Sequence, residues 1–218
     1  AACLLLLGYF SFSAIDLDAQ EHSIDVTIDG LSGDTVFLAH YYGNKMYYAD
    51  TAVADLAGRV HFAGRTNEEC GKHAIVMPGP KYFEFLAVEE DIVIHTTSND
   101  PSGNVEVKES NENILFYDYM AFLSDRRSIA IPHEAVLTDS MASEVSILAA
   151  REVLTSLGNE VAAEQKRILN EHGDMLFAKY LNMVLEPEIP EIPVEIVNFQ
   201  DLQYRWYRNH YWDRVDFT

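Results

Sequence analysis

The hydrophobic pattern of this chain changes period once, near Asn111, and that change constrains the fold more than any single motif. From Ser23 to Ser110 the dominant period is two, as in "SIDVTID", where apolar and polar residues alternate as on a half-buried strand. Beyond Asn111 apolar residues recur at steps of three and four, which is typical of helices. The sequence therefore predicts an α+β fold, with an N-terminal antiparallel β-sandwich or partly open barrel followed by an α-helical module.

The β region is predicted to consist of short strands separated by turns rich in Gly, Pro, Asn and acidic residues. After the first strand, the strand-like runs are "TVFLAHYY", residues 46–54, "RVHFAG", "HAIVM", "YFEFLAV", "IVIHTT" and "NVEVK". Gly58 can adopt a positive φ between residues 46–54 and "RVHFAG", which favours a hairpin there. Pro78 ends "HAIVM", because proline has no amide to donate to a ladder. Short strands at regular spacing are typical of a sandwich or barrel.

The helical region is predicted to begin with a helix at Asn111, capped by Ser110 or by Asn111 itself. Pro132 is expected to end this helix, and a longer one is expected to begin near Thr138. The apolar stripe of the first helix comprises Ile114, Tyr117, Met120 and Ala121. The seam of the second helix comprises Ile147, Ala150, Leu154, Leu157, Val161 and Ile168. An antiparallel helical hairpin is the simplest arrangement of these two helices.

The remaining segments complete the predicted domain organisation. Gly173 is expected to end the second helix, and Asp174 to cap a third, "MLFAKYLNMVL". Residues 186–195, "EPEIPEIPVE", are interpreted as an extended connector rich in Pro and Glu. The predicted boundaries are a β domain at residues 21–110, a helical module at residues 111–199 that includes the connector, and an aromatic helix at residues 200–218.

The chain opens with an apolar run, "AACLLLLGYFSFSAI", that is shorter than the roughly 20 residues a membrane-spanning helix needs. We interpret residues 1–20 as a secretory signal peptide that lacks its start, because no Met, Lys or Arg precedes the run. Cleavage is expected near Ala19 or Gln20. Lipidation is not supported, since Cys3 lies before the leucines of this run and a lipid-accepting cysteine would follow the run. The alternative interpretation of this stretch is a buried N-terminal strand or helix.

The net charge excludes one class of partner. The 35 acidic and 15 basic residues give a formal charge of -20 at pH 7. A field of this sign repels phosphate groups, and the sequence contains no Lys/Arg cluster that would offset it. We therefore expect no nucleic-acid partner, and anionic membrane surfaces are disfavoured for the same reason.

No group of residues in the sequence predicts a catalytic centre, a cofactor site or a metal site. Cys70 is the one cysteine left after the predicted signal peptide, so the chain has no Cys-x-x-Cys pair for dithiol exchange. His40, His61 and His95 fall in predicted strands, but their spacing matches no metal-binding motif. The acidic run "EED" at residues 89–91 falls in a predicted hairpin turn, where solvated side chains are expected.

The C-terminal stretch "YRWYRNHYWDRVDFT" contains the densest set of aromatic and arginine side chains in the chain. As a helix it places three tyrosines and Val215 on one stripe, with Trp206 and His210 on another side. Aromatic residues on more than one face indicate burial between two partners, as a core helix or as an interface. The candidate interdomain interface residues are Tyr204, Trp206, Tyr207, Arg208, His210, Tyr211 and Trp212.

Two parts of the sequence resemble modules of one group of proteins. The stretch "VTIDGLSGDTVFLAHYYGNKMYYADTAVADLAGRVHFAG" resembles the small β domain of unknown function that precedes thioredoxin-like domains in secreted bacterial proteins. The stretches "NEHGDMLFAKYLNMVLEPEIPE" and "YRWYRNHYWDRVDF" resemble the helical module of unknown function that links this β domain to the redoxin domain. The pairing of "LEPEIP" with "YRWYRNHYWD" is the more specific part of the resemblance.

The resemblance implies that this chain is the N-terminal, non-catalytic part of an envelope thiol-disulfide oxidoreductase of a Gram-negative bacterium, truncated before its thioredoxin-like domain. Its implied role is to position or dimerise the redox domain and to bind client proteins. The implied partners are the chain's own C-terminal thioredoxin-like domain, a second copy of the chain and client proteins. The alternative is a stand-alone envelope module that binds a peptide or glycan, with a stacking surface formed by Tyr41, Tyr42, Tyr47 and Tyr48.

Overall fold

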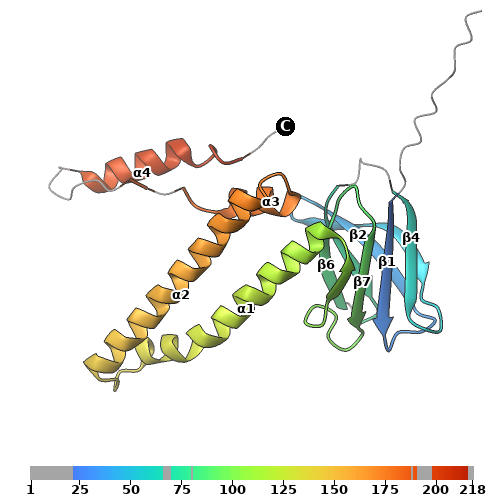
Figure 1. Ribbon diagram of the computed structural model, residues 1–218, viewed down its shortest axis with the longest axis horizontal. Helices are drawn as coiled ribbons and strands as arrows, with labels where there is room; N and C mark the ends of the chain where they lie inside the picture. Colours follow the sequence, from blue (N-terminus) through green and yellow to red (C-terminus); the bar gives the residue numbers. More distant parts are fainter. Residues whose placement is uncertain (1–21, 66–69, 80, 188, 191–197, 216–218) are drawn as a thin grey trace, which may run out of the picture.

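The structure is a computed structural model, and it describes residues 22–65, 70–79, 81–187, 189–190 and 198–215. The predicted signal peptide at residues 1–20 lies outside the described residues, as do residues 188 and 191–195 of the predicted connector. The described part of the chain contains eight strands followed by four helices (Figure 1).

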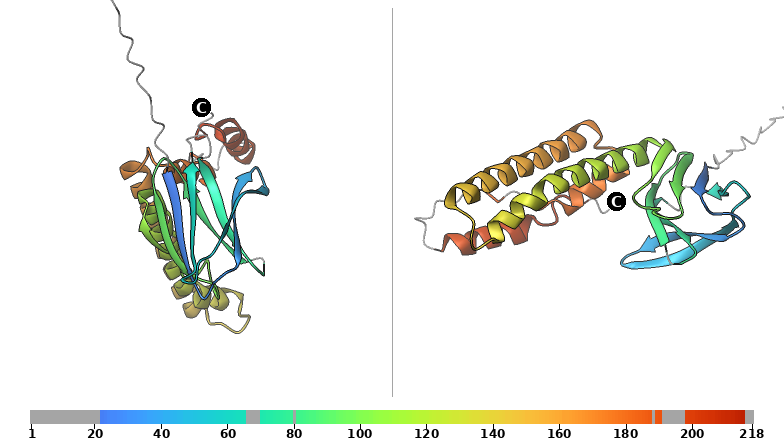
Figure 2. Two further views of the ribbon diagram at one scale, coloured as in Figure 1. Left: turned by 90° about the vertical axis from the view of Figure 1, so that its right-hand side faces the viewer. Right: turned by 90° about the horizontal axis from the view of Figure 1, so that it is seen from below.

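The eight strands form two open four-stranded sheets that pack face to face (Figures 1 and 2). One sheet contains β1 (His22–Asp29), β4 (Arg59–Arg65), β7 (Ile92–Thr97) and β8 (Glu106–Glu109), in the order β4-β1-β7-β8. The other contains β2 (Thr35–Tyr42), β3 (Lys45–Val53), β5 (Gly71–Met77) and β6 (Lys81–Ala87), in the order β3-β2-β5-β6. The predicted α+β class, with a β-sandwich before the helices, is confirmed.

Apolar side chains from both sheets fill the space between them. In β1 the residues Ile24, Val26 and Ile28 are almost fully buried, as their alternation with polar residues predicts. Phe83 and Phe85 of β6 enter the same core from the opposite sheet. Burial of apolar surface, at roughly 25 cal/mol per Å², is the main favourable contribution to folding in such a core.

Two strand pairings differ from those predicted for an antiparallel β domain. β1 pairs with β7 in parallel, with Ile24 opposite Ile92. β3 and β4 do not form the predicted hairpin, because β3 pairs with β2 in one sheet and β4 pairs with β1 in the other. The turn before Gly58 instead carries the chain between sheets, and the Gly58 carbonyl accepts a hydrogen bond from the amide of Ile28. The turn residues therefore predicted the turn, but they could not show which strands pair.

The helices are α1 (Asn111–Thr138), α2 (Glu144–Glu171), α3 (Leu176–Val184) and α4 (Phe199–His210). α1 and α2 form the predicted antiparallel hairpin, which projects away from the sandwich (Figures 1 and 2). Within the predicted seam of α2, Ala150, Leu157 and Ile168 are buried. Of the helices in the described ranges, none has a stretch long and apolar enough to cross a membrane.

The predicted break at Pro132 is wrong, because α1 continues through this residue. A proline inside a helix removes one amide donor and bends the helix, and Figure 1 shows a bend in the yellow-green part of α1. Arg127 and Glu134, on either side of the proline, form an ion pair at 2.6 Å. The helix therefore loses one hydrogen bond at Pro132 without ending there.

Three smaller helix predictions are also wrong. The stripe predicted for the first helix does not form its buried face, since Ile114 and Met120 are 40% and 46% exposed whereas Leu115 and Tyr119 are buried. This error arises because α1 is apolar on more than one side. α2 begins at Glu144 rather than near Thr138, and the N-cap of α3 is Met175 rather than Asp174.

Candidate functional site

The N-terminus of α1 is attached to the sandwich through the acidic turn at residues 89–91. The carboxylate of Glu90 accepts hydrogen bonds from the amides of Asn111 and Glu112, each at 3.2 Å, and from the hydroxyl of Ser110. A carboxylate at this position also interacts favourably with the helix dipole. The turn connects β6 to β7 in the opposite sheet, so it is not the predicted hairpin, and Glu90 anchors α1 instead of being only solvated.

Asn113 joins α1 to the edge of β6 through its side-chain amide. Its Oδ1 accepts a hydrogen bond from the backbone amide of Leu86 at 2.8 Å, and its Nδ2 donates to the carbonyl of Leu86, also at 2.8 Å. The same Nδ2 lies 2.7 Å from the N-cap hydroxyl of Ser110. Asn113 is 0% exposed, so these bonds form in the interior, where unsatisfied polar groups are costly. The side-chain amide of Asn113 thereby makes the two hydrogen bonds that a neighbouring strand would otherwise make with Leu86.

Tyr117, one turn further along α1, makes a second connection to β6. Its hydroxyl donates a hydrogen bond to the carbonyl of Glu84. Burial raises the pKa of this phenol, and the nearby carboxylate of Glu84 raises it further. Tyr117 therefore remains a protonated donor at physiological pH.

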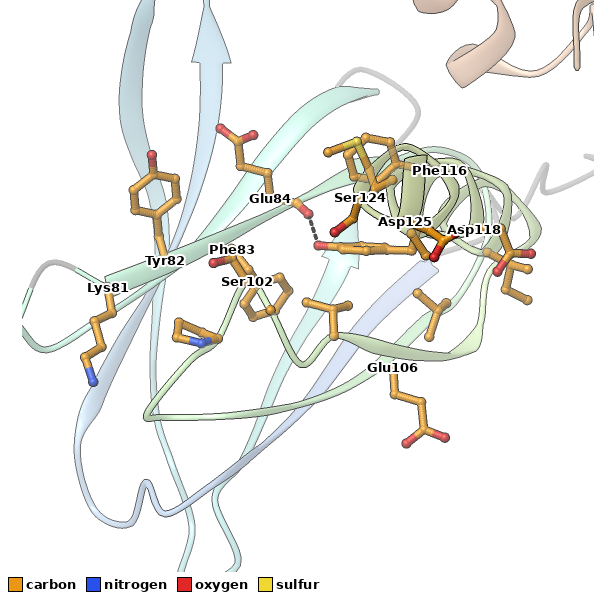
Figure 3. A pocket seen from close by; sticks show the side chains of 18 of the residues that line it. Lys81, Tyr82, Phe83, Glu84, Ser102, Glu106, Phe116, Asp118, Ser124 and Asp125 are labelled. Atoms are coloured by element: carbon orange, nitrogen blue, oxygen red, sulfur yellow. Dashed lines mark hydrogen bonds between the residues drawn. The ribbon is translucent and has the colours of Figure 1, made fainter. Parts of the chain in front are cut away.

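A groove of about 1210 Å³ lies beyond these contacts, between α1, β6 and β8 (Figure 3). β6 is an edge strand of one sheet and β8 is an edge strand of the other, so the groove lies beside one edge of each sheet. Its apolar lining includes Phe83, Val105, Val107, Ile114, Phe116 and Met120. The stripe predicted for the first helix therefore lines this groove. Reasoning from the sequence missed the groove, because its walls come from segments that are far apart in the chain.

Acidic side chains predominate around the groove. The carboxylates that border it are those of Glu84, Glu106, Asp118 and Asp125, whereas Lys81 is the one basic side chain in its lining. Glu84 forms an ion pair with Lys72 at 2.7 Å, and Glu106 and Asp125 pair with Lys108 and Arg126. Asp118 is exposed and has no ion-pair or hydrogen-bond partner for its carboxylate among the described residues.

Glu112 carries a buried carboxylate at the base of the helical module. The carboxylate accepts a hydrogen bond from the backbone amide of Phe177 at the start of α3. Burial raises the pKa of Glu112, and the charge of Glu90 adds to this effect. The amides of Phe177 and Leu176 and the ammonium group of Lys179 act in the opposite direction, without cancelling the effect of burial.

We expect the contribution of Glu112 to stability to be lost as pH rises through its raised pKa. The folded state keeps this proton to a higher pH than the unfolded state does, so this contribution is fully present below the ordinary glutamate pKa of 4.5. Glu112→Gln keeps an acceptor for Phe177 and removes the charge. It should raise the urea midpoint at about pH 7 but not at about pH 4. Glu152→Gln, on the exposed side of α2, is the control, and an equal effect of both variants would contradict this account.

All seven candidate interface residues lie on α4 or in the turn that follows it. None of the residues of α4 is buried by the described chain. Tyr204, Tyr211 and Trp212 are 62%, 44% and 61% exposed, respectively. Arg208 is exposed, and the other three, Trp206, Tyr207 and His210, are partly exposed. The helical module therefore does not provide the burial that the aromatic pattern led us to expect.

The rings of this C-terminal segment contact one another. Trp206 stacks on His210 with a centroid distance of 4.2 Å, and His210 Nδ1 lies 2.7 Å from the Trp206 carbonyl oxygen. The rings of Tyr207 and Tyr211 are 5.5 Å apart, and those of Tyr211 and Trp212 meet edge to face at 4.9 Å. These contacts hold the rings as a preformed aromatic surface along α4 and its turn.

Two polar contacts involve the arginines of this segment. Arg205 forms an ion pair at 2.9 Å with Asp201, one turn earlier in the same helix. Asn182 of α3 donates a hydrogen bond to the carbonyl of Arg214 at 3.2 Å. The end of the segment is thus attached to the helical module, while the aromatic side chains stay accessible.

The four tyrosines of the β2–β3 hairpin do not form a single stacking surface. Tyr41 donates a hydrogen bond to Glu84 at 2.5 Å and lies under the ammonium group of Lys72. Tyr47 and Tyr48 are neighbours in β3 and so point to opposite faces of the sheet. Tyr42 is the most exposed of the four at 79%. Any stacking on this hairpin therefore involves only some of these rings.

The predicted strand histidines lie in three different strands, His40 in β2, His61 in β4 and His95 in β7. His95 lies between the carboxylates of Asp29 and Glu106, at 3.1 and 3.6 Å. Within the ranges that the structure describes, no three His, Cys, Asp or Glu side chains are arranged to hold a metal ion. Cys70 is exposed, directly before β5.

No protein-family model matches this sequence, and no curated protein matches it. Among solved structures, the chain is similar to the crystal structure of a DUF3823 family protein from Parabacteroides merdae, with a TM-score of 0.25 and 16% sequence identity. The similarity covers 41% of this chain and 47% of that chain, so it spans about half the length of the Parabacteroides protein. It concerns part of the fold and no particular site.

Proposed function

We propose that this chain is a non-catalytic accessory module of an exported thioredoxin-like thiol-disulfide oxidoreductase of the bacterial envelope, and that it positions or dimerises the redox domain. The observation that supports this proposal is the uncovered aromatic surface of α4. Tyrosine, tryptophan and arginine are the residue types that most often dominate binding energy at protein interfaces. Tyr204, Trp206 and Arg208 all lie on this helix, with Tyr211 and Trp212 directly after it.

The attachment of the segment fits a docking role. A helix that carries exposed rings must find a partner or leave a large apolar area in water, which is unusual for a monomeric protein. The contact between Asn182 and Arg214 holds the end of the segment near α3. A domain bound to α4 would thus be kept at a defined place beside the helical module. Binding of client proteins is the second part of the role that we propose.

The reading frame that encodes the chain tests the proposal without any protein chemistry. Continued beyond Thr218, it is expected to encode a thioredoxin-like domain with a Cys-x-x-Cys pair. A stop codon directly after Thr218 would contradict the proposal. In vitro, the isolated 218-residue chain is expected to show no reduction of insulin disulfides, and measurable turnover would also contradict an accessory role.

A second candidate function is a stand-alone envelope module that binds a peptide or a glycan. The groove between α1, β6 and β8 favours this alternative, because it is a concave, largely apolar site bordered by polar groups. The exposed rings of Tyr42 and Tyr48 offer further stacking area outside the groove.

A further inference from the structure

β6 is an edge strand, and only some of its outward-facing amides and carbonyls form hydrogen bonds. Asn113 takes the outward amide and carbonyl of Leu86, and Tyr117 takes the carbonyl of Glu84. Because outward groups alternate along a strand, the amides of Glu84 and Tyr82 and the carbonyl of Tyr82 face the same way as those of Leu86. No described residue forms a hydrogen bond with these three groups. An open edge of this kind can pair with another extended chain.

The groove follows this open edge directly. In Figure 3 the side chains of Tyr82 and Glu84 point to one side of β6, while Lys81 and Phe83 point to the other. A strand added to β6 would direct alternate side chains to the same two sides. On the groove side they would meet Val107 of β8, Val105 directly before it, and the exposed side chains of Ile114 and Met120. The site therefore suits small or branched apolar residues at every second position.

The charges around the groove favour basic side chains at the remaining positions of a bound segment, between its apolar residues. Carboxylates outnumber basic groups in its lining, and Asp118 is left without a partner among the described side chains. The ring of Tyr82 is 45% exposed beside the carboxylate of Glu84 and offers a face for a cation. Lysine or arginine side chains in the bound segment would complement these groups, whereas acidic side chains would be repelled.

We propose that the edge of β6 and the adjoining groove bind an extended, cationic segment of a partner protein by strand addition. The segment pairs with the backbone of Tyr82 and Glu84, places alternate apolar side chains in the groove, and directs lysines or arginines toward the ring of Tyr82. This inference deepens the second candidate function and is independent of the docking of α4.

Binding of synthetic peptides to the chain alone tests this inference. The probe is an acetylated and amidated peptide with alternating valine and lysine, and the matched peptide has glutamate in place of lysine. The lysine peptide should bind at least tenfold more tightly and should slow hydrogen exchange at the amides of Tyr82 and Glu84. Equal binding of both peptides, or binding without protection of these amides, would overturn the proposal.

Two pairs of variants separate backbone pairing from charge. Tyr82→Pro removes the outward amide, whereas Tyr82→Ala removes the same side chain and keeps the amide. The proline variant should bind at least fivefold more weakly than the alanine variant. Asp118→Lys should weaken binding of the lysine peptide several-fold, whereas the same charge change in Glu152→Lys on α2 should not.

Backbone N-methylation of the peptide provides a test that does not depend on the folding of any variant. Methyl groups on alternate amides block strand pairing and should abolish binding to the unaltered chain. Two such peptides can be made, one for each set of alternate amides. If both bind as tightly as the unmethylated peptide, or if the two Tyr82 variants bind the peptide equally, strand addition is contradicted. Because the chain is used without a thioredoxin-like domain, these results do not depend on whether α4 docks to one.

Discussion

Replacing Gly58 with alanine is expected to lower the free energy of unfolding by about 4 kcal/mol. Gly58 has a φ of 76°, and a Cβ at this position would lie 2.2 Å from the carbonyl oxygen of Ile28 and 2.8 Å from that of Leu31. Both atoms belong to the backbone, so no side-chain rotation relieves the clash. The turn that transfers the chain between the two sheets would have to move, and with it the start of β4.

Gly33 provides the matched control for this prediction. It has a similar φ of 73°, but a Cβ there would meet no atom within 4 Å. Gly33→Ala should therefore cost only about 1 kcal/mol, from the left-handed conformation alone. Urea unfolding followed by far-ultraviolet circular dichroism measures both variants. If both variants lose the same free energy of unfolding, the contact between a Cβ at position 58 and β1 is not the reason that alanine destabilises this turn.

Asn113→Ala is expected to cost about 3 kcal/mol, because it leaves the amide and the carbonyl of Leu86 buried without partners. Leu86 is 4% exposed, so water cannot readily replace the lost side chain. The same change removes one of the contacts that hold α1 on β6. We therefore also expect faster hydrogen exchange at the amide of Leu86, which reports directly on this edge of the sheet.

Asn209→Ala is the control for Asn113→Ala, since Asn209 is exposed on α4. Its effect on stability should stay within about 0.5 kcal/mol. A loss of less than about 1 kcal/mol for Asn113→Ala would show that the Asn113 amide does not close the edge of β6. The proposed peptide site would then extend to Leu86, because the amide and carbonyl of Leu86 would also be available to pair with the peptide.

The parts of the fold that could be predicted are those in which one local pattern determines one structural outcome. The alternation around Val26 predicts a strand with one buried face, and the spacing of Leu157 and Ile168 predicts the buried seam of α2. A cap at Ser110 or Asn111 could be predicted for the same reason, and the structure has it at Ser110, whose hydroxyl accepts a hydrogen bond from the amide of Asn113.

The remaining features depend on contacts between distant segments, which no local pattern contains. The parallel pairing of β1 with β7 and the groove beside β6 result from how the two sheets meet. α1 is apolar on several sides, so its sequence could not show that Tyr119 is buried while Met120 lines the groove. Asn113 is polar in sequence, and only its position opposite Leu86 explains its burial. The aromatic pattern of α4 predicts burial as a core helix or as an interface, and the described chain buries none of the residues of this helix.

The central claim is that α4 docks to a redox domain, and the fluorescence of the two tryptophans tests it most directly. The chain contains two tryptophans, Trp206 on α4 and Trp212 just after it, so emission reports on this segment alone. In the isolated chain, we expect quenching by acrylamide, chiefly of the exposed Trp212, and emission at longer wavelength than that of buried tryptophan. In the longer protein that we propose, in which a thioredoxin-like domain follows this chain, emission should shift to shorter wavelength and quenching should fall several-fold. Identical emission and quenching in the two proteins would contradict the account.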